Sequence, residues 1–482
     1  MAHHFANEIP SHLLMWRRVR EYAVPPSMVE NATARRAVGD WAGACAAARV
    51  YVDLDLRAVR HRHGTSLVTR LRDDLRRLAP DLLRWHMPRI APDGRLRPGL
   101  TLSLARYGSY GGNPLHLVVR TPPAWADGGQ WMSLSLWEGP GNSTPEHHPH
   151  PHPERRFRLD LHRHLWDAGR SGDLAARSGA GQAPPHDSVW AEGSWAAEAE
   201  VLLRAEGLPR GAFTVRLGAR RRAALELVAP DDSHVPTIRP LRAGTGMPPP
   251  QEIAALPVLP EAAARVLPDL ELLRLGLLPA ERLHPLVATA LAGYGSAPVG
   301  GPVPEPGDPH RVDCRGESHR IALREGVLTA VDHHPAQLRR EELLVALGGP
   351  ALPCLRAIDT VHRDPEALPA VRERLRHGDI AGALAVVEGL LGPGAVLRDG
   401  PLREEVESAA ARRVDHGLFR SGLVAVHPAA GTAGSADVPV GEDGSGAKRV
   451  KVHHRPRLDR FTPLPMRSKR IGRSRPRTGL VS

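Results

Sequence analysis

Apolar residues recur at intervals of three and four along the first 90 residues, which is the spacing of one helix face. Ser27 and Glu30 have the spacing of a capping box at the start of a helix. Gly39 is placed to end that helix, and Asp40 to cap a second one that runs through Ala48. A third, amphipathic helix is predicted over residues 66–78, where one face carries only leucines: Leu67, Leu71, Leu75 and Leu78.

Alternating apolar and polar residues replace this spacing from about residue 100, and alternation is typical of half-buried β-strands. In residues 156–164, for example, Phe157, Leu159 and Leu161 fall on one predicted face. Helical spacing returns between residues 338 and 423. The predicted strands are 101–107, 115–121, 131–137 and 156–164, followed by two hairpins, 213–217 with 223–228 and 319–323 with 327–331.

This order of elements predicts an α+β fold, in which N- and C-terminal helical units flank a central antiparallel β region and a disordered basic tail follows. Stretches rich in Gly and Pro mark the linkers between the parts. The predicted parts are a poorly ordered extension (1–24), a helical unit (25–92), an antiparallel β region (95–242) with a His/Pro loop (139–154), a helical segment with Pro/Gly linkers (243–309), a β-hairpin (310–335), a helical unit (336–424) and the tail (425–482).

The positive charge of the chain is confined to its C-terminal end. The formal net charge is +11 at pH 7; residues 447–482 carry all of it, and the charges of the first 446 residues sum to zero. A basic footprint over a whole domain is therefore excluded, and any attraction to phosphate groups would come from the tail alone. The candidate nucleic-acid contacts in the tail are Lys448, Arg449, Lys451, Arg467, Lys469 and Arg470.

The cysteines and the lack of long apolar runs indicate a cytoplasmic protein. Cys45, Cys314 and Cys354 are widely spaced and form no CxxC motif, so a secreted disulfide framework is not expected. No run approaches the roughly 18 apolar residues that a membrane-spanning helix needs. Arg17 and Arg18 follow a short apolar stretch, which is the reverse of a signal peptide.

Two short segments far apart in the chain are nearly identical. Residues 39–44 and 378–383 match at five of six positions, and each lies between an Arg-rich helix and an apolar one. Both segments resemble the turn between the two helices of a tetratricopeptide repeat, which implies a helical hairpin at each place. Because a solenoid needs about three stacked units, two isolated hairpins are preferred to a repeat array.

A wider resemblance rests on PPSMVE (25–30), APDLLRWH (79–86), FRLDLHRH (157–164) and residues 378–392. These stretches are similar to segments of a group of uncharacterised Streptomyces-type actinobacterial proteins, and the resemblance extends over residues 25–422. It implies an intracellular actinobacterial protein. It carries over no catalytic residue, because the group has no known activity.

The sharpest candidate for chemistry is the set Asp160, His162 and His164, which would project together from the polar face of the predicted strand 156–164. Imidazoles at positions i and i+2 of a strand can share a zinc ion if further ligands come from elsewhere. The alternative interpretation is a solvated polar face. Two other sets are His147, His148, His150 and His152 in the His/Pro loop, and Cys314, His319, Asp332, His333 and His334 around the last hairpin.

Sequence motifs of familiar enzyme classes are absent: the chain has no GxSxG, no HExxH, no EF-hand loop and no GxGxxG after a strand. A neutral body with helical hairpins leads us to expect a non-enzymatic protein–protein interaction or scaffold protein with an unknown protein partner. One alternative is a nucleic-acid-associated protein that acts through its basic C-terminal arm. A second is a metal-dependent enzyme of unknown reaction, and no membrane contact is expected.

Overall fold

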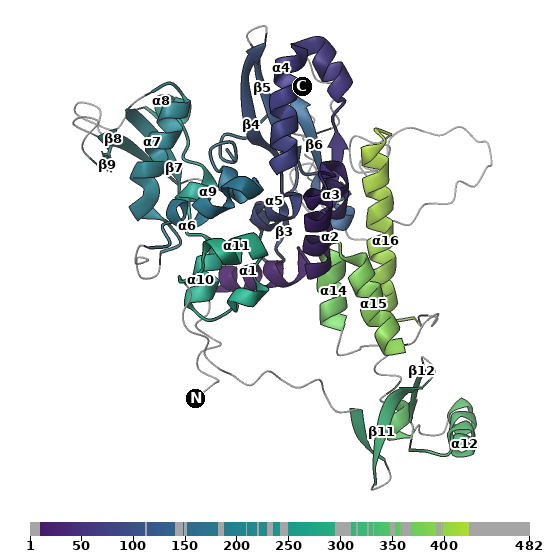
Figure 1. Ribbon diagram of the computed structural model, residues 1–482. Helices are drawn as coiled ribbons and strands as arrows, with labels where there is room; N and C mark the ends of the chain where they lie inside the picture. Colours follow the sequence, from purple (N-terminus) through teal and green to yellow (C-terminus); the bar gives the residue numbers. More distant parts are fainter. Residues whose placement is uncertain are drawn as a thin grey trace, which may run out of the picture. The chain divides into compact units, whose positions relative to one another are not determined.

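The structure is a computed structural model whose contacts divide the chain into two units (Figure 1). Unit 1 consists of residues 1–123 and 131–299, and unit 2 of residues 124–130 and 300–482. Helices lie toward both ends of the chain and antiparallel sheets in its middle, so the predicted α+β class is confirmed. The structure describes residues 10–423 except 111–112, 140–147, 149–151, 182–187, 209, 219–220, 229–234, 242–248, 295–309, 315–316, 325–326, 331, 348–351, 357, 359–367, 392–396 and 398.

Unit 1 begins with five helices: α1 (Ser11–Tyr22), α2 (Pro26–Ala37), α3 (Trp41–Ala47), α4 (Leu56–Arg77) and α5 (Pro80–His86). The leucine face predicted over residues 66–78 is confirmed, because all four leucines are at most 3% exposed. α4 starts earlier than predicted, and its path changes at Gly64, where φ is +82°. The capping box predicted at Ser27 is wrong, since Pro26 takes the first helical position of α2.

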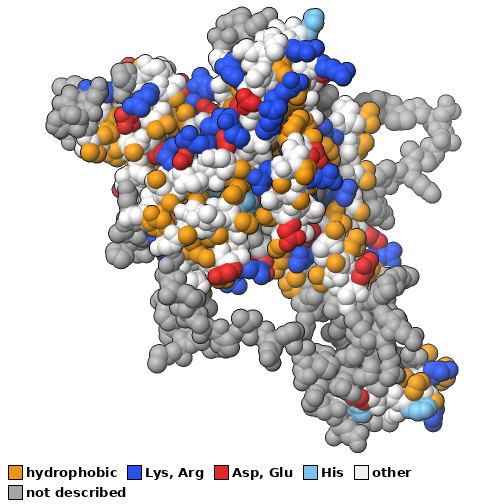
Figure 2. Space-filling model, in the orientation of Figure 1, with side chains coloured by type: hydrophobic (Ala, Val, Ile, Leu, Met, Phe, Trp, Pro, Cys, Tyr) orange, Lys and Arg blue, Asp and Glu red, His pale blue; other side chains and the backbone are white. Residues whose placement is uncertain are grey.

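The outer face of α4 is strongly basic, and Figure 2 shows a concentration of Lys and Arg side chains over this helix. Asp73 forms an ion pair with Arg76 on the same helix at 3.3 Å. With both partners well exposed, the pair is typical of a solvated helix surface. The exposed arginines of α4 are Arg57, Arg60, Arg62, Arg70, Arg72, Arg76 and Arg77.

Helix α1 corrects the prediction of a poorly ordered extension over residues 1–24, of which residues 1–9 lie outside the described part. Leu13 and Val19 belong to the hydrophobic core of unit 1. Arg20 is also buried, where it pairs with Asp269 from a distant part of the chain. Pro10 occupies the N-cap position without a side-chain hydrogen bond, so the local sequence carries no signal for a helix start. The tertiary contacts therefore stabilise α1, not a cap.

The main sheet of unit 1 contains three predicted strands and one that the sequence pattern did not indicate. β4 (Thr101–Tyr110), β5 (Asn113–Arg120) and β6 (Met132–Trp137) pair antiparallel and confirm the prediction. β1 (Val50–Asp53) pairs with β6 in the parallel direction. The strand order is β1-β6-β5-β4, so the sheet is mixed instead of purely antiparallel.

The predicted strand over residues 156–164 is wrong. The segment meets the edge strand β4 at isolated points: Asp160 N donates to Ser103 O at 2.9 Å, and a single bridge joins Ser103 to Arg158. From the N–H group of Leu161 onward the backbone hydrogen bonds close turns within the segment, which ends in the 3-10 helix η4 (Arg163–Leu165). Phe157 and Leu159 are buried, so the alternation reflects two anchored side chains in a loop.

A second hydrophobic cluster in unit 1 is built on the predicted hairpin of β7 (Gly211–Arg216) and β8 (Arg222–Val228), which is confirmed. β9 (Thr237–Pro240) adds a third antiparallel strand. α7 (Trp195–Ala205), a helix inside the region predicted as strands, packs on this sheet through buried residues such as Leu202. Other short elements of unit 1 are β2 (Arg89–Ile90), β3 (Arg95–Leu96), α6 (Leu174–Arg177), α8 (Pro250–Ala255), α9 (Glu261–Ala264), α10 (Pro268–Arg274) and α11 (Pro285–Ala290).

Unit 2 contains a small sheet and a group of helices. The predicted hairpin is confirmed as β11 (Glu317–Arg324) with β12 (Val327–Ala330), and β10 (His310–Cys314) adds a third antiparallel strand. Throughout the residues that the structure describes, no helix combines the length and apolar content needed to cross a membrane. The helices of unit 2 include α12 (Pro335–Ala346), α14 (Leu368–Arg376), α15 (Ile380–Leu391) and α16 (Pro401–Arg420).

The two near-identical segments form the same helical turn, between α2 and α3 in unit 1 and between α14 and α15 in unit 2. Gly39 and Gly378 have positive φ angles of +78° and +84°, a region that favours glycine. Asp40 and Asp379 each accept a hydrogen bond from the backbone N–H three residues later, at 2.8 and 3.2 Å. The arginine five residues before each aspartate donates to its other oxygen, at 3.0 and 2.8 Å. Each segment therefore closes a helical hairpin.

Candidate functional site

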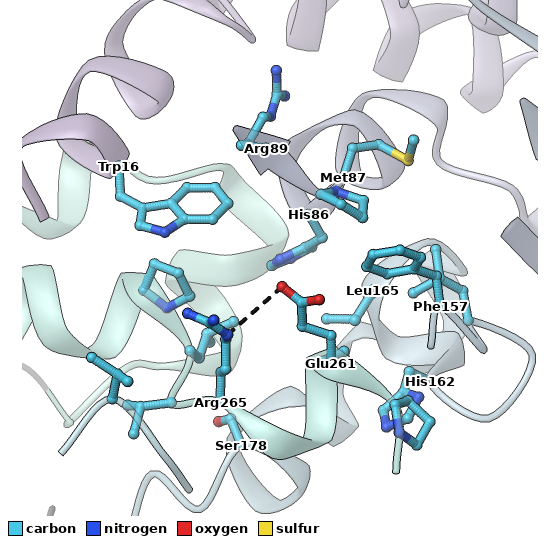
Figure 3. Close-up of a pocket in the computed structure, with 18 of the residues that line it drawn as sticks. Trp16, His86, Met87, Arg89, Phe157, His162, Leu165, Ser178, Glu261 and Arg265 are labelled. Carbon is cyan, nitrogen blue, oxygen red and sulfur yellow. Dashed lines mark ion pairs between the residues drawn. The ribbon is translucent and has the colours of Figure 1, made fainter. Parts of the chain in front are cut away.

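A cavity of about 310 Å³ lies within unit 1 (Figure 3). Most of its lining comes from residues 12–20, 86–97, 156–165 and 260–271, which the fold brings together from four distant parts of the chain. His162 and His164 line this cavity, whereas Asp160 does not. Its volume is in the range of sites that hold small molecules, so this cavity is the candidate site.

A buried ion pair holds α1 in place as one wall of the cavity. Arg20 Nε and Nη2 donate to the two carboxylate oxygens of Asp269 at 2.8 and 2.7 Å. Trp85 Nε1 donates to the same carboxylate at 3.1 Å. The Arg20 guanidinium also lies over the rings of Trp16 and Trp85, 4.9 and 4.4 Å from their centroids. This network ties α1 to α5 and α10, and it leaves the indole of Trp16 at the cavity wall.

The apolar part of the lining faces two neutral imidazoles. Burial lowers the pKa of His86 well below its usual value, and Arg20 and His164 lower it further. Burial likewise lowers the pKa of His164 well below its usual value, as does the neighbouring His162. Both rings are therefore neutral at pH 7. Figure 3 shows His86 and Glu261 pointing into the same space, with Trp16 and Phe157 on opposite sides of it.

His162 is fully engaged by protein groups. Its Nδ1 lies 3.0 Å from Arg158 O, and its Nε2 lies 3.1 Å from a carboxylate oxygen of Glu198. Each ring nitrogen therefore faces an oxygen atom of the protein. Arg177 donates to Glu198 as well, at 2.5 and 2.7 Å, and its hydrogen bonds lower the pKa of Glu198 to about 2 against the effect of burial. His162 is thus a structural link to α7.

The geometry assumed for a zinc site at Asp160, His162 and His164 is not formed, because these residues do not lie on a strand. Arg158 holds both oxygens of Asp160, at 2.8 to 3.1 Å. The His162 and His164 rings are 5.7 Å apart and inclined at 69°. Among the described residues no three candidate ligands come together in a way that could hold a metal ion. Bound zinc stays a prediction with no supporting geometry at these three residues.

Arginine dominates the charged lining of the cavity. Seven of the lining residues are arginines, and the acidic ones are Glu261 and Glu271. Acidic partners just outside the lining neutralise Arg20, Arg158 and Arg177. Burial lowers the pKa of Arg89 to about 9, and its guanidinium donates to two backbone carbonyl oxygens. Figure 3 shows this side chain extending away from Trp16 and His86, so Arg89 supports the wall.

The remaining three cations, Arg97, Arg156 and Arg265, are named here the arginine cluster. Arg156 Nη2 donates to Glu261 at 2.8 Å, and Arg265 Nε lies 3.6 Å from the other oxygen of Glu261. Burial lowers the pKa of Arg97, and the cluster's other two arginines lower it further, against the opposing effect of Glu261 and Glu154. Two guanidiniums, those of Arg156 and Arg265, thus share one lining carboxylate, and Arg97 has no ion pair with it among the described residues.

Glu271 is a lining carboxylate whose pKa is shifted toward neutral pH. Burial raises the pKa of Glu271 to about 7, although Arg274 and Arg265 act in the opposite direction. His12 Nε2 lies 3.7 Å from its carboxylate, and burial lowers the pKa of His12. At pH 7 Glu271 is therefore divided between its neutral and charged forms, and it can donate or accept a hydrogen bond.

The other candidate residues are not among the described residues that line this cavity. In unit 2, His319 and His333 stack at 4.1 Å, and His334 instead caps α12 by accepting a hydrogen bond from Ala336 N. The side chain of Cys314 lies outside the described residues, as do His147 and His150. The tail candidates also lie outside them, so nucleic-acid binding stays a prediction for Lys448, Arg449, Lys451, Arg467, Lys469 and Arg470.

Sequence reasoning missed most of the cavity residues, including Trp16, Arg20, Arg97 and Glu271. One signal was present: Asp269 stands in the apolar run of residues 266–273, where a buried charge requires a partner. The identity of that partner depends on the fold. Comparisons of the chain with protein-family models, curated proteins and solved structures find no match.

Proposed function

We propose that unit 1 binds a small organic anion in the cavity lined by the arginine cluster. The observation that carries the proposal is the small number of hydrogen bonds that the three guanidiniums make to other protein groups. Among the described residues they make a single side-chain hydrogen bond to protein, from Arg156 to Glu261. A guanidinium has five N–H donors, so most donors of the cluster are available to a ligand.

A bound anion would offset the repulsion among the three positive charges of the arginine cluster, which Glu261 offsets only in part. Like charges next to one another and partly withdrawn from water are unfavourable, and the lowered pKa of Arg97 reflects this. The apolar walls at Trp16, Met87 and Phe157 favour a ligand with a carbon body over a bare inorganic ion. The ligand expected from this lining is an organic anion.

The experiment is thermal unfolding of the full chain with a panel of small organic anions and their neutral or cationic analogues. A bound ligand stabilises the folded state in proportion to the logarithm of its concentration above Kd. We expect at least one anion to raise Tm in a saturable manner, and we expect Arg97→Gln to reduce that shift at equal anion concentration. Arg60→Gln is the matched control, because it removes the same charge from the exposed face of α4. Equal shifts with neutral analogues, or an unchanged response of Arg97→Gln, would overturn the proposal.

A protein-interaction role is a second candidate, favoured by the apolar face of α12 in unit 2. Leu343, Leu344 and Leu347 are 64%, 45% and 85% exposed. Exposed leucines in a row are typical of surfaces that bind another protein. Leu343→Glu should abolish co-purification of a partner, while Leu384→Glu, at an exposed leucine of α15, should not. Retention of the partner by both variants would contradict this role.

The proposal includes a cytoplasmic location. Cys45 and Cys354 are buried, and burial raises the pKa of Cys45 to about 12. A thiol protected in this way behaves as an apolar core residue, which suits a reducing compartment. The nucleic-acid alternative is tested separately, by deleting residues 447–482 and measuring DNA and RNA binding at several salt concentrations.

A further inference from the structure

The geometry points to a phosphate monoester as the ligand, with its phosphate group at the arginine cluster and a flat apolar body against Trp16. This inference rests on the proposed binding of an organic anion and names the chemical class of that anion. It draws on the charge of the cluster, the donors it offers and the separate apolar wall of the cavity.

The charge of the cluster fits a dianion better than a monoanion. Arg97, Arg156 and Arg265 carry three positive charges, and two carboxylates of the lining oppose them. Glu261 pairs with Arg156 and Arg265, and Glu271, whose pKa Arg265 lowers against the effect of burial, is partly ionised at pH 7. Just outside the lining, Glu154 and Arg216 offset each other. A net charge between +1 and +2 remains at the cluster. A phosphate monoester carries about −1.5 to −2 at pH 7, whereas a carboxylate carries −1.

The number of available donors leads to the same ligand. A phosphate monoester offers three terminal oxygens, each of which can accept several hydrogen bonds. Guanidinium groups bind such oxygens in pairs, through two parallel N–H donors. Arg97 makes no side-chain hydrogen bond in the described part of the chain, and Arg156 uses one nitrogen for Glu261. The N–H donors that these guanidiniums do not use outnumber the three terminal oxygens, so a phosphate group can be bound without breaking the existing ion pair.

The body of the ligand is expected to be planar and apolar. Trp16, His86 and Phe157 present rings to the cavity, and Met87 and Leu165 fill its sides. His86 is neutral, so it adds no charge to this end and can exchange a hydrogen bond with a polar group on the ligand. An aromatic ring on the ester would lie here, because aromatic faces pack favourably with one another.

The test is isothermal titration calorimetry on the full chain at pH 7.5 with three probes: phenyl phosphate, benzoate and inorganic phosphate. We expect phenyl phosphate to bind most tightly, because only this probe has both the dianion and the ring. Arg97→Gln should weaken it about tenfold or more, which is the size of a lost hydrogen bond between charged groups. In Trp16→Ala, phenyl phosphate should bind no more tightly than inorganic phosphate. Arg60→Gln should leave the Kd of both ligands unchanged.

Each outcome separates this inference from the proposed function. Benzoate binding as tightly as phenyl phosphate would overturn the phosphate assignment and leave the organic-anion proposal standing. If inorganic phosphate binds as tightly as phenyl phosphate, the inference that the ligand has an apolar body is overturned. No binding of any probe, together with no response to the wider panel of anions, would overturn both. Because Arg97→Gln could disturb the wall, Arg97→Lys serves as a second variant: it keeps the charge, loses the fork and is expected to bind with intermediate affinity.

Discussion

Replacing Asp269 by Asn tests how unit 1 holds α1, and with it one wall of the cavity. Arg20 donates to both oxygens of Asp269, at 2.8 and 2.7 Å, and the two side chains are only 1% and 0% exposed. Trp85 Nε1 donates to the same carboxylate. Asn keeps the shape of the side chain but removes its negative charge. Arg20 then stays buried without an opposite charge, and one of its hydrogen bonds meets an amide N–H₂ group.

The expected loss in the free energy of unfolding is about 3–5 kcal/mol, which is typical of removing one partner from a buried ion pair. Arg35→Gln is the control, because the Arg35–Asp40 pair has a similar distance of 3.0 Å but is 61% and 36% exposed. The control is expected to lose about 1 kcal/mol or less. The double variant Arg20→Met/Asp269→Leu should recover much of the loss, since it leaves no unpaired charge in the core.

Hydrogen exchange of the backbone amides in increasing urea is the suitable assay. The chain has two units, so a single unfolding transition of the whole protein would not report on unit 1 alone. Exchange measured in α1, α5 and α10 gives the local free energy of opening where the ion pair lies. We expect protection to fall in all three helices for Asp269→Asn, and in none of them for the control.

Two results would refute this reasoning. A loss for Asp269→Asn of about 1 kcal/mol or less, comparable to the exposed control, would mean that the pair contributes no more than a surface salt bridge. A loss for Arg20→Met/Asp269→Leu equal to the sum of the losses of Arg20→Met alone and Asp269→Leu alone would mean that Arg20 and Asp269 act independently.

Three further predictions concern local groups. Asp40→Ala in unit 1 and Asp379→Ala in unit 2 should each cost about 1 kcal/mol, the usual value of a helix N-cap, and unequal losses in local hydrogen exchange would contradict their equivalence. Burial raises the pKa of Glu271 from 4.5 to about 7, so the folded state binds the proton more tightly than the unfolded chain. The free energy of unfolding should therefore fall by roughly 3 kcal/mol as the pH rises from 4.5 to 7, and Tm should fall with it. In Glu271→Gln, Tm should depend less on pH over this range. Burial lowers the pKa of His116 to about 4, so the unfolded chain binds the proton first and the free energy of unfolding should fall as the pH is lowered from 6.5 to 4. An NMR titration in which His116 is protonated near pH 6.5 would contradict this effect of burial. Ser103→Ala should cost about 1 kcal/mol, because it removes the Oγ that lies against His116 Nδ1.

The sequence by itself determined the elements whose signals are local. The leucines of residues 66–78 form a buried helix face, because side chains three and four positions apart always share a face of a helix. The strands after residue 100 alternate for the corresponding reason. The turns at Gly39 and Gly378 needed only a residue that tolerates positive φ and an aspartate to cap the next helix. In each case the bonding partners lie within a few residues.

Tertiary structure alone decided the features whose partners are far apart. Arg20 pairs with Asp269, which lies 249 residues away in the sequence. This pair stabilises α1, although the segment has no local signal for a helix start. Residues 156–164 have the alternation of a strand, but their backbone bonds to β4 only at isolated points and otherwise forms turns. His162 Nε2 therefore lies against the carboxylate of Glu198 and does not project from a strand face as a metal ligand would. The cavity has the same origin, because four segments must meet before Arg97, Arg156 and Arg265 line one space with Glu261. Such pairings depend on which surfaces pack together, and the periodicity of one segment carries no information about the position of another.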